Sequence, residues 1–179
     1  MNISVFGGAQ PRPDSLEYEE ARLLGGLLAQ RGHTVLTGGY IGVMEAVSRG
    51  ASEAGGHVIG VTCEDIEAWR KVKANAWVKE ERRRKTLLER MQAIIEDCDA
   101  AIAMPGGLGT LAEISVMWNL MAVESLHRRP LILVGAGWKS TLDQFFASFE
   151  SYMPFHQRDE LLFAEDVKEA VVSLDSLLV

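Results

Sequence analysis

Short apolar runs alternate with longer amphipathic stretches along most of the chain. Residues 2–6 form an apolar run of β-branched and aromatic side chains that ends at a glycine pair, and residues 15–31 repeat leucine and alanine at helical spacing. The same order of apolar run, glycine pair and amphipathic stretch returns over residues 33–54. This alternation predicts strands that are joined by helices, and strands connected in this way run parallel.

The alternation continues through the second half of the chain. Three further apolar runs are predicted as strands and two amphipathic segments as helices. The strands are residues 57–61, 100–104 and 130–134, and the helices are residues 108–125 and 138–149. The pattern predicts one α/β domain over residues 1–179, with a Rossmann-like, doubly wound parallel sheet of about five or more strands and helices on both faces.

Residues 62–85 are the least regular part of the chain. We expect an extra strand here and an excursion over the edge of the sheet. The charged run at residues 80–85 is interpreted as a solvated face. Thr86 and Glu89 have the spacing of a capping box, so the next helix is predicted to begin there, with Arg90 in or next to its first turn.

Composition and charge narrow the classes of function. The chain has 179 residues, of which 47% are hydrophobic and 24% charged, as in ordinary folded proteins. The formal net charge of −7 argues against a broad surface for nucleic acid or anionic membranes, but a small anionic ligand in a locally basic pocket is compatible with it. No apolar run approaches the roughly 20 residues that cross a bilayer. We therefore expect a cytoplasmic protein without nucleic-acid or membrane partners.

Metal-binding and disulfide patterns are not evident. Cys63 and Cys98 lack CxxC spacing, and the four histidines are scattered singly. We expect no structural zinc site, no metal and no cofactor.

Three glycine-rich turns follow predicted strands and should meet at one edge of the sheet, because parallel strands share their carboxyl edge. They are Gly7-Gly8, the segment 38–42 and the segment 105–110. Glycine lets backbone amides approach a ligand closely, and helix N-termini add free N–H groups, so a phosphate is the predicted ligand. For Gly7-Gly8, a plain tight turn is an equally good interpretation.

Glu113 lies one helical turn beyond the third glycine turn and could project its carboxylate toward the mouth of the pocket. The alternative is a helix N-terminal acid that the dipole favours. The chain contains neither GxxxxGK[ST] nor GxGxxG, which lowers the rank of P-loop kinases and ordinary NAD dehydrogenases.

The segment 105–113 reads PGGLGTLAE and resembles the PGGxGTxxE motif of the LOG family. Characterised members of that family, long labelled lysine decarboxylases, are cytokinin riboside 5'-monophosphate phosphoribohydrolases. The resemblance covers about residues 2–135 and implies hydrolysis of the N-glycosidic bond of a nucleoside 5'-monophosphate, with a small-molecule nucleotide as the partner. It also implies a homodimer, and the helix from Glu113 to Glu124 is apolar enough to be shared between core and interface.

The resemblance also implies roles for individual residues. Glu113 and Arg90 would carry catalysis, since Glu89-Arg90 matches the family's ER at a helix start; a purely structural ion pair between Arg90 and Glu113 is the alternative. The residues that the resemblance places around the phosphate or nucleotide lie in or beside the glycine turns. They are Gly8, Gly39, Gly42, Met44, Gly106, Gly107, Gly109 and Thr110.

The chain departs from the family pattern in two places. The first loop reads Gly7-Gly8-Ala9-Gln10 instead of CGSS, and the proline after the third strand and the HERK run are missing. These departures indicate a divergent branch and leave the substrate open. A non-catalytic carrier of a nucleotide or phosphorylated cofactor is the alternative function, whereas nothing specific in the sequence argues for a pyridoxal phosphate site.

Overall fold

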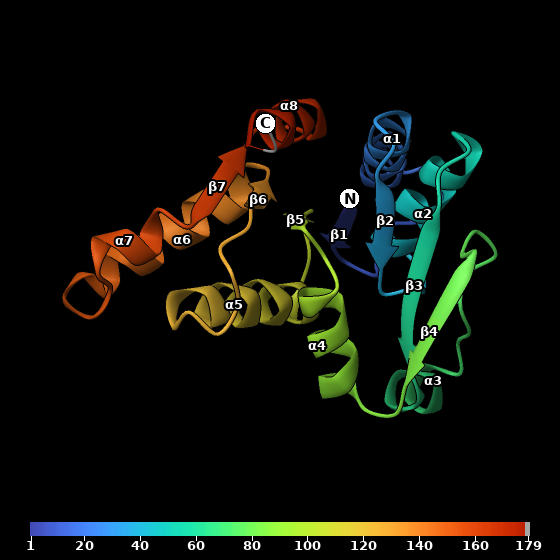
Figure 1. Cartoon of the computed structure of the whole chain (residues 1–179), viewed down its shortest axis with the longest axis horizontal. Helices are drawn as coiled ribbons and strands as arrows, with labels where there is room; N and C mark the ends of the chain where they lie inside the picture. Colours follow the sequence, from blue (N-terminus) through green and yellow to red (C-terminus); the bar gives the residue numbers. More distant parts are fainter. Residues whose placement is uncertain (178–179) are drawn as a thin grey trace.

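The structure is a computed structural model that describes residues 1–177. All its strands join one parallel seven-stranded sheet in the order β4-β3-β2-β1-β5-β6-β7 (Figure 1). The strands are β1 Asn2–Phe6, β2 Thr34–Thr37, β3 Val58–Cys63, β4 Glu80–Arg84, β5 Ala100–Ala103, β6 Leu131–Val134 and β7 Leu161–Ala164.

Helices cover both faces of the sheet because apolar side chains alternate between the two faces of each buried strand. Helices α1, α2 and α8 pack on one face, and α4, α5 and α6 pack on the other. The helices are α1 Leu16–Gln30, α2 Val43–Glu53, α3 Glu64–Arg70, α4 Leu87–Glu96, α5 Leu108–Ala122, α6 Ala136–Ser148, α7 Phe155–Arg158 and α8 Val167–Leu177, with a 3-10 turn η1 at Glu150–Tyr152. The predicted doubly wound α/β fold is confirmed.

The strand order reverses between β1 and β5. The chain first builds the sheet outward from β1 to β4, then returns to pair β5 with the free side of β1 and builds outward again to β7. The carboxyl ends of β1 and β5 therefore lie side by side, with Phe6 opposite Ala103. A switch point of this kind opens a crevice between the connections that leave in opposite directions.

The charged run at residues 80–85 is more than the solvated face that we expected. Most of it is β4, the predicted extra strand at the sheet edge, which pairs in parallel with β3 from Glu80 to Arg84. An edge strand has one neighbour only and tolerates charge on both faces. Arg82 uses this exposure to bridge Glu80 at 2.7 Å and Asp97 at 2.9 Å.

The structure also shows the helix cap, the cysteines and the helices on which the sequence bears. The capping box of Thr86 and Glu89 is present at the start of α4. Cys63 and Cys98 are both buried and free. No helix within residues 1–177 is long and apolar enough to cross a membrane. The predicted domain range of 1–179 includes two final residues that lie outside the described ones.

Candidate functional site

The three glycine turns meet at the carboxyl edge of the sheet, and the first and third turns border one cleft of about 590 Å³, to which Met44, just after the second turn, also contributes. Two backbone hydrogen bonds join the turns. The amide of Gly8 donates to the carbonyl of Pro105 over 3.1 Å, and the amide of Val43 donates to the carbonyl of Gly8 over 2.9 Å. The first turn is thus fixed both to the PGG turn and to the start of α2, as the shared-edge argument predicted.

The N-terminus of α5 opens into this cleft without a side-chain cap. Gly107 is the N-cap residue, and the first backbone bond inside the helix runs from the Leu111 amide to the Gly107 carbonyl. The amides of Leu108, Gly109 and Thr110 precede that bond and point from the positive end of the helix dipole. The arrangement provides N–H donors for an anion.

Gly107 and Gly109 have no neighbour that explains why they are glycine. A methyl group built at either residue would meet no other atom within 4 Å, and neither residue has a positive φ. Both residues line the cleft. The absence of a side chain therefore leaves space on the side from which a ligand would approach.

Arg90 is buried at the base of the site, with 5% of its surface exposed. Its Nε donates to the carbonyl of Val61 over 2.9 Å, and its guanidinium carbon lies 5.7 Å from the centre of the Tyr40 ring. The remaining nitrogens lie close to two residues that line the cleft: Nη2 is 3.7 Å from the sulfur of Met44, and Nη1 is 3.6 Å from Oε1 of Glu113. The guanidinium is therefore oriented by the protein before any ligand binds.

Glu113 comes from the second turn of α5 and is 8% exposed. Burial raises the pKa of its carboxyl group to about 7, and the nearby positive charge of Arg90 offsets only part of that effect. Burial penalises the charged form of a carboxyl group, whereas an adjacent cation favours it. A carboxyl group with a pKa near neutrality can exchange a proton during a reaction at physiological pH.

The structure brings most of the predicted site residues together. Gly8, Met44, Gly107, Gly109, Thr110 and Glu113 line the cleft. Arg90 contacts two of these residues, Met44 and Glu113. The other three predicted residues lie at the same edge and shape the turns.

Those three glycines face protein rather than the cleft. A methyl group at Gly39 would approach the backbone of Gly60, one at Gly42 would overlap Ala9, and one at Gly106 would overlap the side chain of Thr110. Gly39 and Gly42 also have φ values of 76° and 73°, which favour glycine for conformational reasons.

Two features of the cleft were not singled out from the sequence. A methyl group at Gly38 would overlap Nη2 of Arg90, so this glycine makes room for the guanidinium. Trp69 and Arg70, from α3, stand on the rim of the cleft. The glycine turn signalled Gly38 only as one of several glycines. The irregular composition of residues 62–85 gave no sign that α3 would line the same cleft as the PGG turn.

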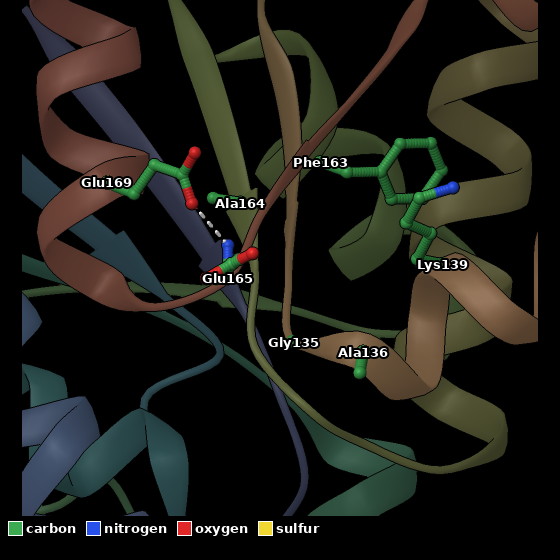
Figure 2. Close-up of a pocket in the computed structure, with 7 residues that line it drawn as sticks. All are labelled: Gly135, Ala136, Lys139, Phe163, Ala164, Glu165 and Glu169. Atoms are coloured by element: carbon green, nitrogen blue, oxygen red, sulfur yellow. Dashed lines mark hydrogen bonds between the residues drawn. The ribbon is translucent and has the colours of Figure 1, made fainter.

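A second hollow of about 500 Å³ lies at the ends of β6 and β7. Figure 2 shows that one of its two acidic side chains serves the local backbone: the carboxylate of Glu169 accepts a hydrogen bond from the amide of Glu165. Lys139 lies beside the ring of Phe163 and pairs with Asp143 at 2.8 Å. Within residues 1–177, no group of three His, Cys, Asp or Glu side chains could hold a metal ion.

Comparison of the sequence with known proteins identifies the family of this chain. The profile of the SLOG cluster4 family matches residues 1–170. The chain belongs to the SLOG cluster4 family. This SLOG cluster4 protein is also 32% identical over 176 residues to the cytokinin riboside 5'-monophosphate phosphoribohydrolase LOG of Oryza sativa subsp. japonica, an alignment that covers 96% of the chain and 67% of the rice protein.

Two further relatives bear on function. The cytokinin riboside 5'-monophosphate phosphoribohydrolase LOG4 of Arabidopsis thaliana is 31% identical to the SLOG cluster4 protein, with 97% of this chain and 81% of LOG4 aligned. Among solved structures, the molybdenum cofactor binding protein of Rippkaea orientalis superposes with a TM-score of 0.77 and 26% identity, covering 99% of this chain and 97% of that one. The predicted membership of a divergent LOG-like group is confirmed.

Proposed function

We propose that the protein hydrolyses the N-glycosidic bond of a nucleoside 5'-monophosphate, releasing the free base and ribose 5-phosphate. The observation that carries the proposal is the placement of a buried carboxyl group, Glu113, beside Arg90 and one helical turn from the free N-terminus of α5. The similarity to phosphoribohydrolases of rice and Arabidopsis supports the same reaction.

The phosphate of the substrate would bind at the amides of Leu108, Gly109 and Thr110. One turn of helix rises about 5 Å, so a phosphate held there places the sugar beside the carboxylate of Glu113. Binding energy from the remote phosphate then fixes the position of the reacting bond, and orientation of this kind can supply several kcal/mol of the barrier.

Cleavage of the bond between base and ribose develops positive charge on the sugar ring. The carboxylate of Glu113 would stabilise that charge or activate the water that attacks the anomeric carbon, as carboxylates do in other glycosidic cleavages. The water supplies a hydroxyl group to C1' and a proton to the departing base. Arg90 would bind the ligand and hold the carboxylate in place.

A screen of nucleoside 5'-monophosphates tests this function. Each nucleotide is incubated with the protein, and free base is measured by liquid chromatography, with Glu113→Gln as the matched control. Release of base by the wild type that the variant lacks supports the proposal. Absence of release from every nucleotide, at concentrations at which binding is saturated, contradicts it.

A carrier of a nucleotide or phosphorylated cofactor is the second candidate function. The superposition on the molybdenum cofactor binding protein of Rippkaea orientalis favours it, and the first loop, which lacks the hydroxyl groups of CGSS, is compatible with it. The same incubation separates the candidates: tight binding of a nucleotide without release of base would make the carrier the better account.

We also propose that the protein forms a homodimer in the cytoplasm. Helix α5 and its C-cap residue support the dimer because they leave large apolar side chains exposed outside the cleft: Leu111, Val116 and Val123. Light scattering at micromolar protein concentration tests it, and a monomeric mass would contradict it. The buried, unpaired Cys63 and Cys98 support a reducing compartment.

A further inference from the structure

Helix α3 places a tryptophan on the rim of the cleft. Trp69 is 73% exposed, and α3 contributes no buried residue to either core of the protein. The guanidinium of Arg70 lies over the indole, 4.5 Å from its centre. Both side chains nevertheless line the cleft that contains Glu113. The indole is therefore presented to the cleft and to solvent rather than used for packing.

The position of α3 is fixed by contacts from its polar residues. Glu67 pairs with Arg83 of β4 at 2.8 Å, and the carboxylate of Asp65 accepts a hydrogen bond from the amide of Leu87, at the start of α4, over 2.9 Å. Leu87 also lines the cleft. These contacts tie α3 to the segment that carries Arg90, so the position of the indole is linked to that of the catalytic pair.

The wall between Trp69 and Glu113 suits a flat, aromatic group. Besides the indole, the cleft is lined by the apolar side chains of Met44, Leu87, Met91 and Leu108. The amides proposed to bind phosphate belong to the start of α5, whereas Trp69 belongs to α3. A nucleotide bound with its phosphate at these amides would extend its base toward the indole and the apolar side chains.

We infer that Trp69 is the base-binding residue of this site and that the ligand is a nucleotide whose base stacks on the indole. This inference rests on the proposed function, because it takes the phosphate position from it. Every base has a π face, so stacking selects for the presence of a base and tolerates its identity. Arg70 stabilises the indole through a cation–π contact and adds positive charge at the mouth, which attracts an anionic ligand.

Two ligands that differ by the base test the inference. AMP and ribose 5-phosphate share the phosphate and the sugar, and their dissociation constants are measured by calorimetry in a Glu113→Gln background, where AMP is not consumed. Trp69→Ala is expected to weaken AMP binding by about 5- to 150-fold, the range that loss of one stacked base implies. Binding of ribose 5-phosphate should change less than twofold, and Trp69→Phe should keep most of the affinity for AMP.

Tyr152→Ala is the matched control, because Tyr152 is 81% exposed and lies on η1, away from the cleft. It should leave both dissociation constants unchanged. The inference is overturned if Trp69→Ala leaves AMP binding intact, if it weakens both ligands equally, or if the parent protein binds AMP no more tightly than ribose 5-phosphate.

The binding test of Trp69 and the base-release test of the proposed function can give different results. AMP binding that depends on Trp69, in a protein that releases no base from any nucleotide, would leave the inference standing and remove the hydrolase. If the wild type releases base and Trp69→Ala binds AMP normally, the hydrolase function would stand and the inference about Trp69 would be overturned.

Discussion

Replacing Gly109 by alanine is expected to separate the stability of the fold from its affinity for phosphate. A methyl group at this position meets no protein atom within 4 Å, and Gly109 does not have a positive φ, so alanine fits the folded chain. Gly109 is the second residue of α5. Alanine in place of a helical glycine typically adds about 0.5–1 kcal/mol to the free energy of unfolding, so Gly109→Ala should be somewhat more stable than the wild type.

The same methyl group would lie in the cleft where the phosphate is proposed to bind. A hydrogen bond from an amide to a charged oxygen is worth about 1.5–3 kcal/mol, so displacing the phosphate from one amide should weaken ribose 5-phosphate binding roughly 10- to 150-fold. Thermal unfolding followed by circular dichroism measures the stability, and calorimetry measures the binding.

Gly137→Ala is the matched control for this prediction. Gly137 is the second residue of α6, and a methyl group there also meets no atom within 4 Å, but the residue lies outside the cleft. It should gain similar stability and keep the affinity of the wild type. Equal affinities in all three proteins would show that the start of α5 does not hold the phosphate.

Three further predictions concern Glu113 and Arg90. Because the pKa of Glu113 is raised to about 7 and its ionised form is the reactive one, kcat/KM should rise with pH with a midpoint near 7; a flat profile between pH 5.5 and 8.5 would contradict this role. The folded-state pKa lies above that of the unfolded chain, so ionisation of Glu113 removes stability as the pH rises from about 4.5 to 7. In urea unfolding, the free energy of unfolding of Glu113→Gln should therefore increase relative to that of the wild type over that interval, by up to about 3 kcal/mol. A difference that does not vary with pH would refute the raised pKa of Glu113. Arg90→Ala should impair both nucleotide binding and single-turnover rate, and its loss of rate should be less than additive with that of Glu113→Gln; fully additive losses would indicate independent roles.

The sequence predicted the central part of the fold because buried strands and amphipathic helices have different hydrophobic periods. β4 could not be recognised from its composition, because this edge strand consists only of charged residues from Glu80 to Arg84. Only its position along the chain indicated an extra strand. The segment after residue 149 was left without an expectation. It adds the single turn of α7 and the strand β7, each four residues long and too short for a hydrophobic period to repeat. It also adds α8, whose buried residues Val167, Ala170, Val171 and Leu174 do follow the helical period.

The candidate site was predictable to the level of turns but not of individual contacts. The glycine motif located the cleft, and its match to a known family pointed to Glu113 and Arg90. Which glycine serves which purpose depends on tertiary packing: Gly38 rather than Gly39 makes room for the guanidinium of Arg90. Trp69 reaches the cleft only because α3 folds back against the start of α4, and that contact joins residues that are distant in the sequence.

The rate at which Glu113→Gln releases base tests most directly whether the carboxylate of Glu113 takes part in the reaction. Glutamine is nearly isosteric with glutamate but cannot carry the negative charge that would stabilise the sugar cation. With the best nucleotide found in the screen, liquid chromatography should show that the variant releases base on the order of 100-fold or more slowly than the wild type, while its dissociation constant for ribose 5-phosphate stays within a few fold. Turnover at the wild-type rate would contradict the account, because Glu113 would then be an acid at the start of α5 and no part of the chemistry.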